Sequence, residues 1–103
     1  MYVRIITFGL EGLEPDTYRA HTEKIAPAFT AWPGLISKVW LAEGPDHRYG
    51  GVYLFADKAA ANASRDTDIF RGMSANPNFA DLRIEEYDVL DAPTAVTAGA
   101  ATT

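Results

Sequence analysis

Residues 35–55 read LISKVWLAEGPDHRYGGVYLF, and this stretch decides the fold. Two runs rich in β-branched, aliphatic and aromatic residues, 35–41 and 49–55, flank a polar cluster at 43–48 that contains Gly and Pro. Runs of this composition on either side of a short turn are typical of a β-hairpin. The sequence therefore predicts two neighbouring antiparallel strands at the centre of the chain.

A strand and a helix are predicted on each side of this hairpin. Upstream, residues 3–8 (VRIITF) have the composition of a strand, and an amphipathic helix begins at Pro15 and continues to about residue 31. Downstream, Asp57 is a helix cap, and a second helix runs from 58 to about 73. A turn at 75–78 then leads into a last strand at 81–89. The order βαββαβ predicts a ferredoxin-like α+β fold, with a four-stranded antiparallel sheet and both helices on one face.

The chain has 103 residues, which is the size of one domain. We assign residues 1–91 to the ferredoxin-like domain. Residues 92–103 carry no charge and consist mostly of Ala and Thr. They are predicted to be a flexible tail that is frayed, or an arm that orders only against a partner.

The chain is acidic, since 9 Lys and Arg against 14 Asp and Glu give a formal net charge of −5. A chain of this charge without a Lys/Arg cluster binds phosphate poorly, which argues against nucleic acid and anionic membranes as partners. No stretch resembles a leader or is long and apolar enough to span a bilayer, so we expect a cytoplasmic protein.

Several kinds of chemistry are excluded or disfavoured by the residue types. Cys is absent, which excludes disulfides, thiolate catalysis, zinc–cysteine sites and iron–sulfur clusters. His21 and His47 are the only histidines and show no metal-ligand spacing, so no metal site is predicted. Neither a phosphate-binding glycine loop nor a Ser-His-Asp arrangement is present, which predicts no nucleotide cofactor and no serine hydrolysis.

The strand residues divide by period-two alternation into two sets, one for each face of the sheet. The first set is aliphatic: Val3, Ile5, Leu35, Val39, Leu41, Val52, Leu54, Leu82 and Ile84. The second set is aromatic with a few cations: Tyr2, Arg4, Ile6, Phe8, Ile36, Lys38, Trp40, Tyr53, Phe55, Arg83 and Tyr87. Neither set is polar enough to face water, so we expect a homodimer whose sheets pack face to face. The alternation leaves open which set meets the helices.

Three candidate catalytic residues come from this pattern. His21 lies on the predicted buried face of the first helix and could act as a general base, or it could simply bond a backbone carbonyl. Trp40 and Tyr53 fall on one sheet face together with Phe55. There they could stack on a planar ligand, with the Tyr53 hydroxyl orienting a carbonyl or phenolate, or they could only pack a tight dimer.

The remaining candidates are substrate-binding residues. Arg4, Lys38 and Arg83 could stabilise an oxyanion or enolate, or pair with acidic residues such as Glu85 across a subunit interface. Three helix-face aromatics are expected in the core or in the wall of a pocket: Tyr18, Phe29 and Trp32. Gly50 and Gly51 are attributed first to hairpin geometry and second to room for a ligand.

Several segments together resemble the YdhR-type monooxygenase family, over roughly residues 3–90. The likeness lies in PGLISKVW at 33–40, GGVYLF at 50–55, DKAAA at 57–61, NPNF at 76–79 and YDVL at 87–90. That family is placed with the antibiotic-biosynthesis monooxygenases, which are dimeric α+β barrels of two ferredoxin-like subunits. Characterised members of the wider group oxidise quinol- or anthrone-like polyketides without metal or flavin, because the deprotonated substrate itself reacts with dioxygen.

The resemblance implies a cofactor-independent monooxygenase that acts on a small aromatic or polyketide-type substrate between sheet and helices. Two other functions remain open at this point: an isomerase, cyclase or lyase that uses the same pocket, and a non-catalytic dimer that binds a small ligand. For haem, the sequence offers His21 as a single candidate ligand of the iron.

Overall fold

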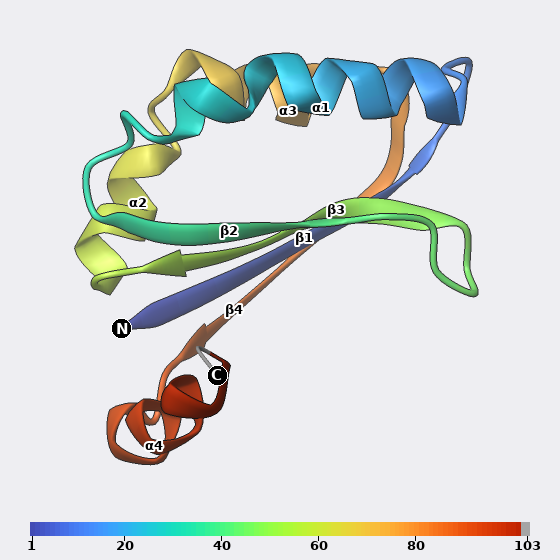
Figure 1. Cartoon of the computed structure of the whole chain (residues 1–103). Coiled ribbons are helices and arrows are strands. Elements are labelled where there is room, and N and C mark those ends of the chain that lie inside the picture. The colour runs from blue at the N-terminus through green and yellow to red at the C-terminus, as the bar shows by residue number, and fades with distance from the viewer. Residues whose placement is uncertain (102–103) are drawn as a thin grey trace.

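The predicted ferredoxin-like fold is confirmed by the computed structural model, which describes residues 1–101 (Figure 1). Four strands form one antiparallel sheet in the order β2-β3-β1-β4. The strands are β1 (Tyr2–Leu10), β2 (Leu35–Leu41), β3 (Arg48–Phe55) and β4 (Phe79–Asp88). The helices are α1 (Pro15–Phe29), α2 (Lys58–Ser64), α3 (Asp68–Ala75) and α4 (Asp91–Ala101).

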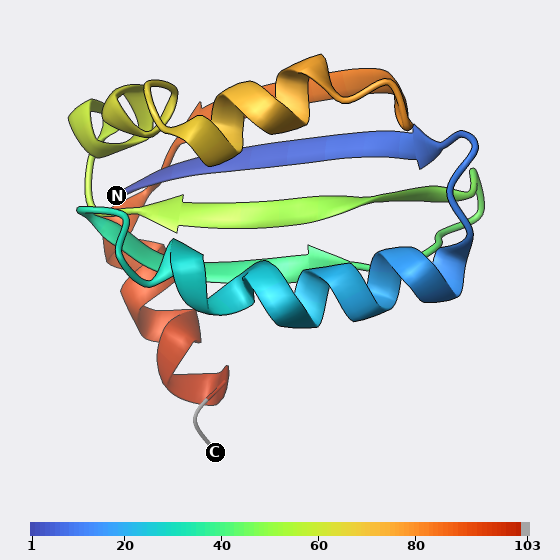
Figure 2. The ribbon, with the colours of Figure 1, turned by 90° about the horizontal axis from the view of Figure 1, so that it is seen from above.

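The helices α1, α2 and α3 all cover the same face of the sheet. Seen from above, α1 runs over β2 and β3, whereas α3 runs over β1 and β4 (Figure 2). The hairpin from which the prediction started is present, with Lys38 opposite Tyr53 and Val39 opposite Val52. No helix among the described residues is long and apolar enough to cross a membrane.

The second helix was predicted as one segment, and this is wrong in detail. The Asp57 carboxylate does cap α2, where it accepts a hydrogen bond from the Ala60 amide at 2.8 Å. However, α2 ends at Ser64, and Thr67 begins a new helix by accepting a hydrogen bond from the Phe70 amide at 3.2 Å. A capping residue inside an amphipathic stretch interrupts it, because its side chain replaces the helical backbone bonds.

The face of the sheet that meets the helices is the aromatic one. Tyr2, Ile6, Phe8, Tyr53 and Phe55 are buried beneath the helices, and the fully buried Arg4 lies among them. The opposite face carries the aliphatic side chains of β1, β2 and β3. None of α1, α2 and α3 covers this face, and Val39 on it is 58% exposed.

Six residues were assigned to the wrong set. In β2, an irregularity between Leu35 and Ser37 turns Leu35 toward the core and leaves Ile36 exposed. In β4, the residues alternate between the two faces as predicted, but each residue lies on the opposite face of the sheet from the one assigned to it. Pairing places Ile84 opposite Ile6 and Tyr87 opposite Val3. Consequently Leu82 and Ile84 pack on the core, whereas Arg83 and Tyr87 are exposed.

Residues 92–101, most of the segment predicted as a frayed tail or as an arm that orders against a partner, are helical in the structure. They belong to α4, which lies on the side of the sheet opposite to the other helices (Figure 1). The N-terminal amine of Met1 pairs with Asp91 at 3.0 Å and ties the start of α4 to β1. The last two residues of the predicted tail, 102 and 103, lie outside the described residues.

Candidate functional site

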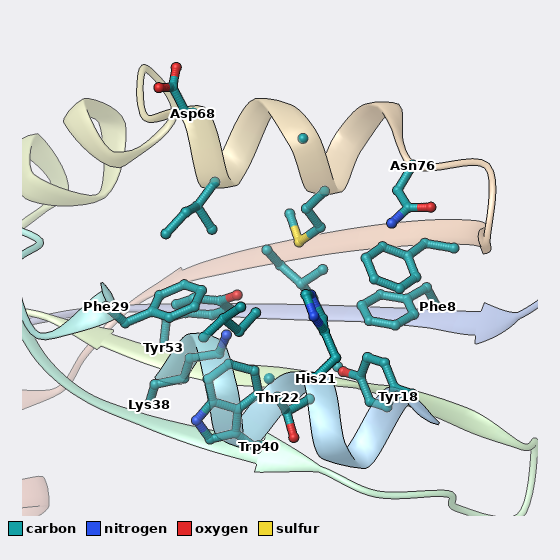
Figure 3. Close-up of a pocket in the computed structure, with 18 residues that line it drawn as sticks. Phe8, Tyr18, His21, Thr22, Phe29, Lys38, Trp40, Tyr53, Asp68 and Asn76 are labelled. Atoms are coloured by element: carbon teal, nitrogen blue, oxygen red, sulfur yellow. The ribbon is translucent and has the colours of Figure 1, made fainter. Parts of the chain in front are cut away.

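A cavity of about 300 Å³ lies between the sheet and the helices α1 and α3. Residues of β1, β2 and β3 form its floor, and the two helices form its walls. Figure 3 shows how most of these side chains converge. The polar lining groups are Tyr18, His21, Thr22, Lys38, Tyr53, Asp68 and Asn76, and the apolar side chains are Ile6, Phe8, Ile25, Phe29, Trp40, Ile69, Met73 and Phe79.

The Lys38 side chain occupies a box of three aromatic rings on the floor of this cavity. Its Nζ lies 3.4 Å from the ring centroid of Trp40, 3.7 Å from that of Phe29 and 4.5 Å from that of Tyr53 (Figure 3). No carboxylate pairs with this amine, and no hydrogen bond reaches it, among the residues that the structure describes. Lys38 is therefore a half-buried amine with no counter-charge among the described residues.

Two effects act on the Lys38 amine in opposite directions. Burial lowers the pKa of Lys38 from 10.5 to about 7, because the ammonium loses its hydration. Ring faces stabilise an ammonium by about 0.5–2 kcal/mol and offset part of this penalty. The lowered pKa means that a neutral amine is present near physiological pH, which is unusual for Lys.

The hydroxyl groups of Tyr53 and Tyr18 remain neutral donors in this environment. Tyr53 is 3% exposed and lies between stacked neighbours, with ring centroids 6.1 Å from both Trp32 and Phe55. Burial, followed by the neighbouring Tyr18 hydroxyl, raises the pKa of Tyr53 well above its usual value. Burial likewise raises the pKa of Tyr18 to about 12. Both phenols can therefore donate a hydrogen bond to a ligand without ionising.

His21 lies on α1 at the mouth of the cavity rather than in the core. The sequence predicts a buried position, but the residue is exposed while its ring still lines the cavity. This places the imidazole between solvent and the interior, where it can pass protons. The other histidine, His47, is 82% exposed in the turn after β2 and contacts Glu43.

Gly50 and Gly51 are each required by a different close contact in the structure. Gly50 has φ of +150°, and a Cβ there would lie 1.8 Å from the carbonyl oxygen of Ile6. Close approach of β3 to β1 thus requires glycine. A Cβ on Gly51 would lie 2.8 Å from the Lys38 Cε. The second glycine therefore gives the lysine its place over the aromatic rings.

Arg4 does not line the cavity, although the sequence indicates it as a substrate-binding residue. Its guanidinium is fully buried and donates hydrogen bonds to Glu86 at 2.8 Å, to the Ser64 hydroxyl at 2.7 Å and to the Ala61 carbonyl at 2.7 Å. Each of the three nitrogens makes one hydrogen bond, so Arg4 joins α2 to β1 and β4 as a buried structural residue outside the cavity lining.

Three more predicted substrate-binding residues lie outside the cavity lining. Trp32 and Phe55 are buried beside Tyr53, where they hold its ring in place. Arg83 is 58% exposed on the open face and pairs with Asp81 at 2.8 Å. The structure thus brings six of the ten predicted residues to the cavity: Tyr18, His21, Phe29, Lys38, Trp40 and Tyr53.

The α3 wall was not identified from the sequence. Ile69, Met73 and Asn76 all line the cavity, at a spacing of i, i+4 and i+7. This is the helical pattern that marks one face, and it could have indicated a second wall opposite α1. Among the described residues, no group of three His, Cys, Asp or Glu side chains is arranged to hold a metal ion.

The chain was compared with known families and proteins. The family model described as "Putative mono-oxygenase ydhR" matches residues 4–100. The chain belongs to this family. The resemblance stated from the sequence is thereby confirmed. No curated protein matches the chain.

Solved structures share the fold at low sequence identity. SnoaB, a cofactor-independent oxygenase from Streptomyces nogalater, is 16% identical, with a TM-score of 0.68 and coverage of 88% of this chain and 94% of that one. A "Putative antibiotic biosynthesis monooxygenase" from Nitrosomonas europaea is 17% identical, with a TM-score of 0.71 and coverage of 87% and 99%. The heme-degrader MhuD from Mycobacterium tuberculosis is 18% identical, with a TM-score of 0.71 and coverage of 87% and 96%.

Proposed function

We propose that the protein is a cofactor-independent monooxygenase that oxidises a small aromatic or polyketide-type substrate in the cavity between sheet and helices. The observation that carries the proposal is the Lys38 amine, which lines the cavity without a counter-charge among the described residues and lies against the rings of Phe29, Trp40 and Tyr53. Membership in the mono-oxygenase family supports the same class of reaction.

The first step is removal of a proton from an acidic phenol or enol. The neutral Lys38 amine takes this proton, so the substrate O–H bond breaks and an N–H bond forms. The resulting ammonium then pairs with the substrate anion that it created, and the dry surroundings strengthen this pair. Tyr53 donates a hydrogen bond to the substrate oxygen and fixes the position of that oxygen in the cavity.

The second step is reaction of the electron-rich anion with dioxygen. A carbon of the substrate gives two electrons to dioxygen and forms a C–O bond, and the peroxide takes up a proton. Loss of water then leaves a new carbonyl group. One oxygen atom remains in the product and the other leaves as water, so dioxygen is the only oxidant needed. Trp40 and Phe29 flank the flat substrate, and His21 returns protons to solvent.

The same acid and base could serve an isomerase, cyclase or lyase. The observation that favours this second function is the pairing of a proton-accepting amine with a neutral phenol donor, which needs no dioxygen. Turnover under anaerobic conditions separates the two functions.

A second copy of the chain is proposed to cover the open face of the sheet. That face leaves Val39, Ile36 and Tyr87 more than half exposed, at 58%, 54% and 52%. The exposed apolar side chains Leu90 and Val96 flank or belong to α4, which lies on this same side. We therefore propose a homodimer with sheets packed face to face and α4 reaching toward the partner.

Oxygen uptake tests the proposed activity. The purified protein, treated with chelator, is mixed with anthrone or a substituted hydroquinone in an oxygen-electrode cell. Uptake above the protein-free rate is expected, with at least a tenfold loss in Lys38→Met and Tyr53→Phe. Lys24→Met, which removes an exposed lysine on α1, is the matched control and should keep the wild-type rate.

Two outcomes would remove the proposal. One is the absence of uptake above background across the substrate panel. The other is equal uptake in wild type, Lys38→Met and Tyr53→Phe. Titration with haemin in the same buffer is the control for haem chemistry, because a Soret shift with consumption of the added haem would assign the cavity to a different reaction.

A further inference from the structure

We propose that Lys38 is a carbonyl-reactive amine, which forms an imine with an aldehyde or ketone whose flat apolar body fits the aromatic cavity. The inference goes beyond oxygenation, since imine formation needs no dioxygen. It assigns a covalent site and a ligand class to the floor of the cavity.

The position of the amine carries this inference. Lys38 rises from β2 into the cavity, and its Nζ lies within 4.5 Å of three ring centroids. In the part of the chain that the structure describes, no carboxylate forms an ion pair with it. The missing Cβ of Gly51 leaves the space that the Lys38 Cε occupies. The lysine is therefore held beside the cavity instead of reaching to solvent.

The titratable groups that face this amine do not stabilise its charged, protonated form. On α1 these are Tyr18 and His21, on β3 it is Tyr53, and on α3 it is Asp68. The two tyrosines stay neutral, and His21 and Asp68 are exposed at the rim. Burial keeps the pKa of Lys38 near 7, so a nucleophilic neutral amine is available where a surface lysine would be protonated.

The reaction balances without another reagent. The nitrogen lone pair forms a C–N bond with the carbonyl carbon, and the C=O π electrons move to oxygen, which takes up a proton. The carbinolamine then loses water and leaves a C=N bond. Tyr53 is the nearest buried phenol on the floor and donates a hydrogen bond to the departing oxygen. An apolar cavity favours this loss of water, because it does not solvate the departing molecule.

Reductive trapping tests the proposal on the wild-type chain. The protein is incubated at pH 7 under nitrogen with cinnamaldehyde and sodium cyanoborohydride, which converts an imine to a stable secondary amine. Peptide mass spectrometry then locates the adduct. The chain has only three lysines, and Lys24 and Lys58 are exposed, so they are internal reference amines. Modification of Lys38 at least tenfold above both references is expected.

A pH series separates a reactive amine from mere contact with the aldehyde. The excess of trapping at Lys38 over Lys24 and Lys58 should be greatest near pH 7 and should shrink as the pH rises, because burial lowers the pKa of Lys38. Lys38→Arg keeps a cation in the box but has no amine for imine formation, and it should lose the cavity adduct only. Circular dichroism checks that this variant folds.

The proposal is overturned if Lys38 is modified no faster than Lys24 and Lys58 at pH 7. It is also overturned if its rate follows the same pH profile as theirs, because the ring faces would then hold a permanent ammonium. The N-terminal amine of Met1 is assigned by its own peptide and does not enter the comparison. Both proposals use a neutral Lys38 amine, but their tests are separate. Trapping is done without dioxygen and oxygen uptake is measured without an aldehyde, so a failed adduct with normal uptake and a failed uptake with a normal adduct are different results.

Discussion

The two faces of the sheet are made by the same strands, but they differ in the chemistry of their side chains and in whether α1, α2 and α3 pack over them. The face beneath the helices carries large aromatic side chains, which leave a cavity because flat rings and two separate helices do not fill the space completely. The open face carries Val3, Ile5, Val39, Val52 and Leu54, which are compact, and none of these five residues lines the cavity. One face is thus suited to hold a small molecule and the other to pack against a second surface.

The cations show the same contrast at single residues. Arg4 and Lys38 are on the covered face. Arg4 makes a hydrogen bond from each of its three nitrogens, and Lys38 has no carboxylate or hydrogen-bond partner among the described residues. Arg83 is on the open face, paired with an exposed aspartate. Three residues that look alike in a strand pattern therefore have three different roles, and each can be tested by substitution.

Loss of Arg4 should have the largest effect. In Arg4→Met the buried Ser64 hydroxyl and Ala61 carbonyl lose a charged donor, and Glu86 keeps only Arg65. The free energy of unfolding should therefore fall by about 3 kcal/mol. The matched substitution on the open face, Arg83→Met, should change it by less than about 0.5 kcal/mol. Urea unfolding followed by tryptophan fluorescence measures both. Equal losses in the two variants would contradict the assignment of the faces.

A charge on the open face should dissociate the proposed dimer. Val39→Asp places a carboxylate on the open face at the edge strand β2, where residue 39 points away from the cavity. We expect the dissociation constant to rise by at least about 100-fold, or about 2.7 kcal/mol. Sedimentation velocity measures it, with Lys24→Asp on α1 as the control. A monomeric wild type at micromolar concentration would contradict the dimer.

The buried lysine should make stability rise with pH. The unfolded chain holds a proton on Lys38 up to about pH 10.4, whereas the folded chain releases it near pH 7. The unfolded state therefore binds more protons between these values, so the free energy of unfolding increases from pH 7 to pH 9, by about 1–2 kcal/mol. Lys38→Met should abolish this increase. A wild-type curve that is flat over the same range would show that the ammonium persists in the fold.

Glu86 should have the smallest effect, at the acid end. Burial alone would raise the pKa of Glu86, but the hydrogen bond and charge of Arg4, followed by Arg65, outweigh burial and lower it. Its contribution to stability is thus present above the unfolded pKa of about 4.3 and is lost as pH falls through the lower folded pKa. Glu86→Gln should therefore show a shallower loss of stability between pH 5 and pH 2. A slope identical to that of wild type would contradict the pairing.

The order of the elements could be predicted from the sequence because each one has a local signal. The hairpin, the Asp57 cap and the strand compositions are examples. Quantities that depend on two segments at once could not be predicted. The phase of β4 against β1 decides whether Ile84 or Tyr87 is inside, and alternation within one strand carries no information about it. The cap at Thr67 was overlooked inside an amphipathic run.

The candidate site was predictable where the residue type alone indicates a pocket. Trp40 and Tyr53 reach the cavity as expected, because both alternate onto one face of a hairpin. For a cation, the sequence could not distinguish Arg4, whose partners come from α2 and β4, from Lys38, which meets rings only. That difference depends on which helix lies above each strand, and it separates a structural residue from a reactive one.

The most direct test of the central claim compares the two faces in one oxygen-uptake experiment. Metal-free wild type, Tyr53→Phe on the covered face and Arg83→Met on the open face are assayed with the same anthrone substrate. We expect uptake in wild type and Arg83→Met at equal rates, and at least a tenfold loss in Tyr53→Phe. Equal rates in all three proteins, or loss only in Arg83→Met, would contradict a reaction in the aromatic cavity.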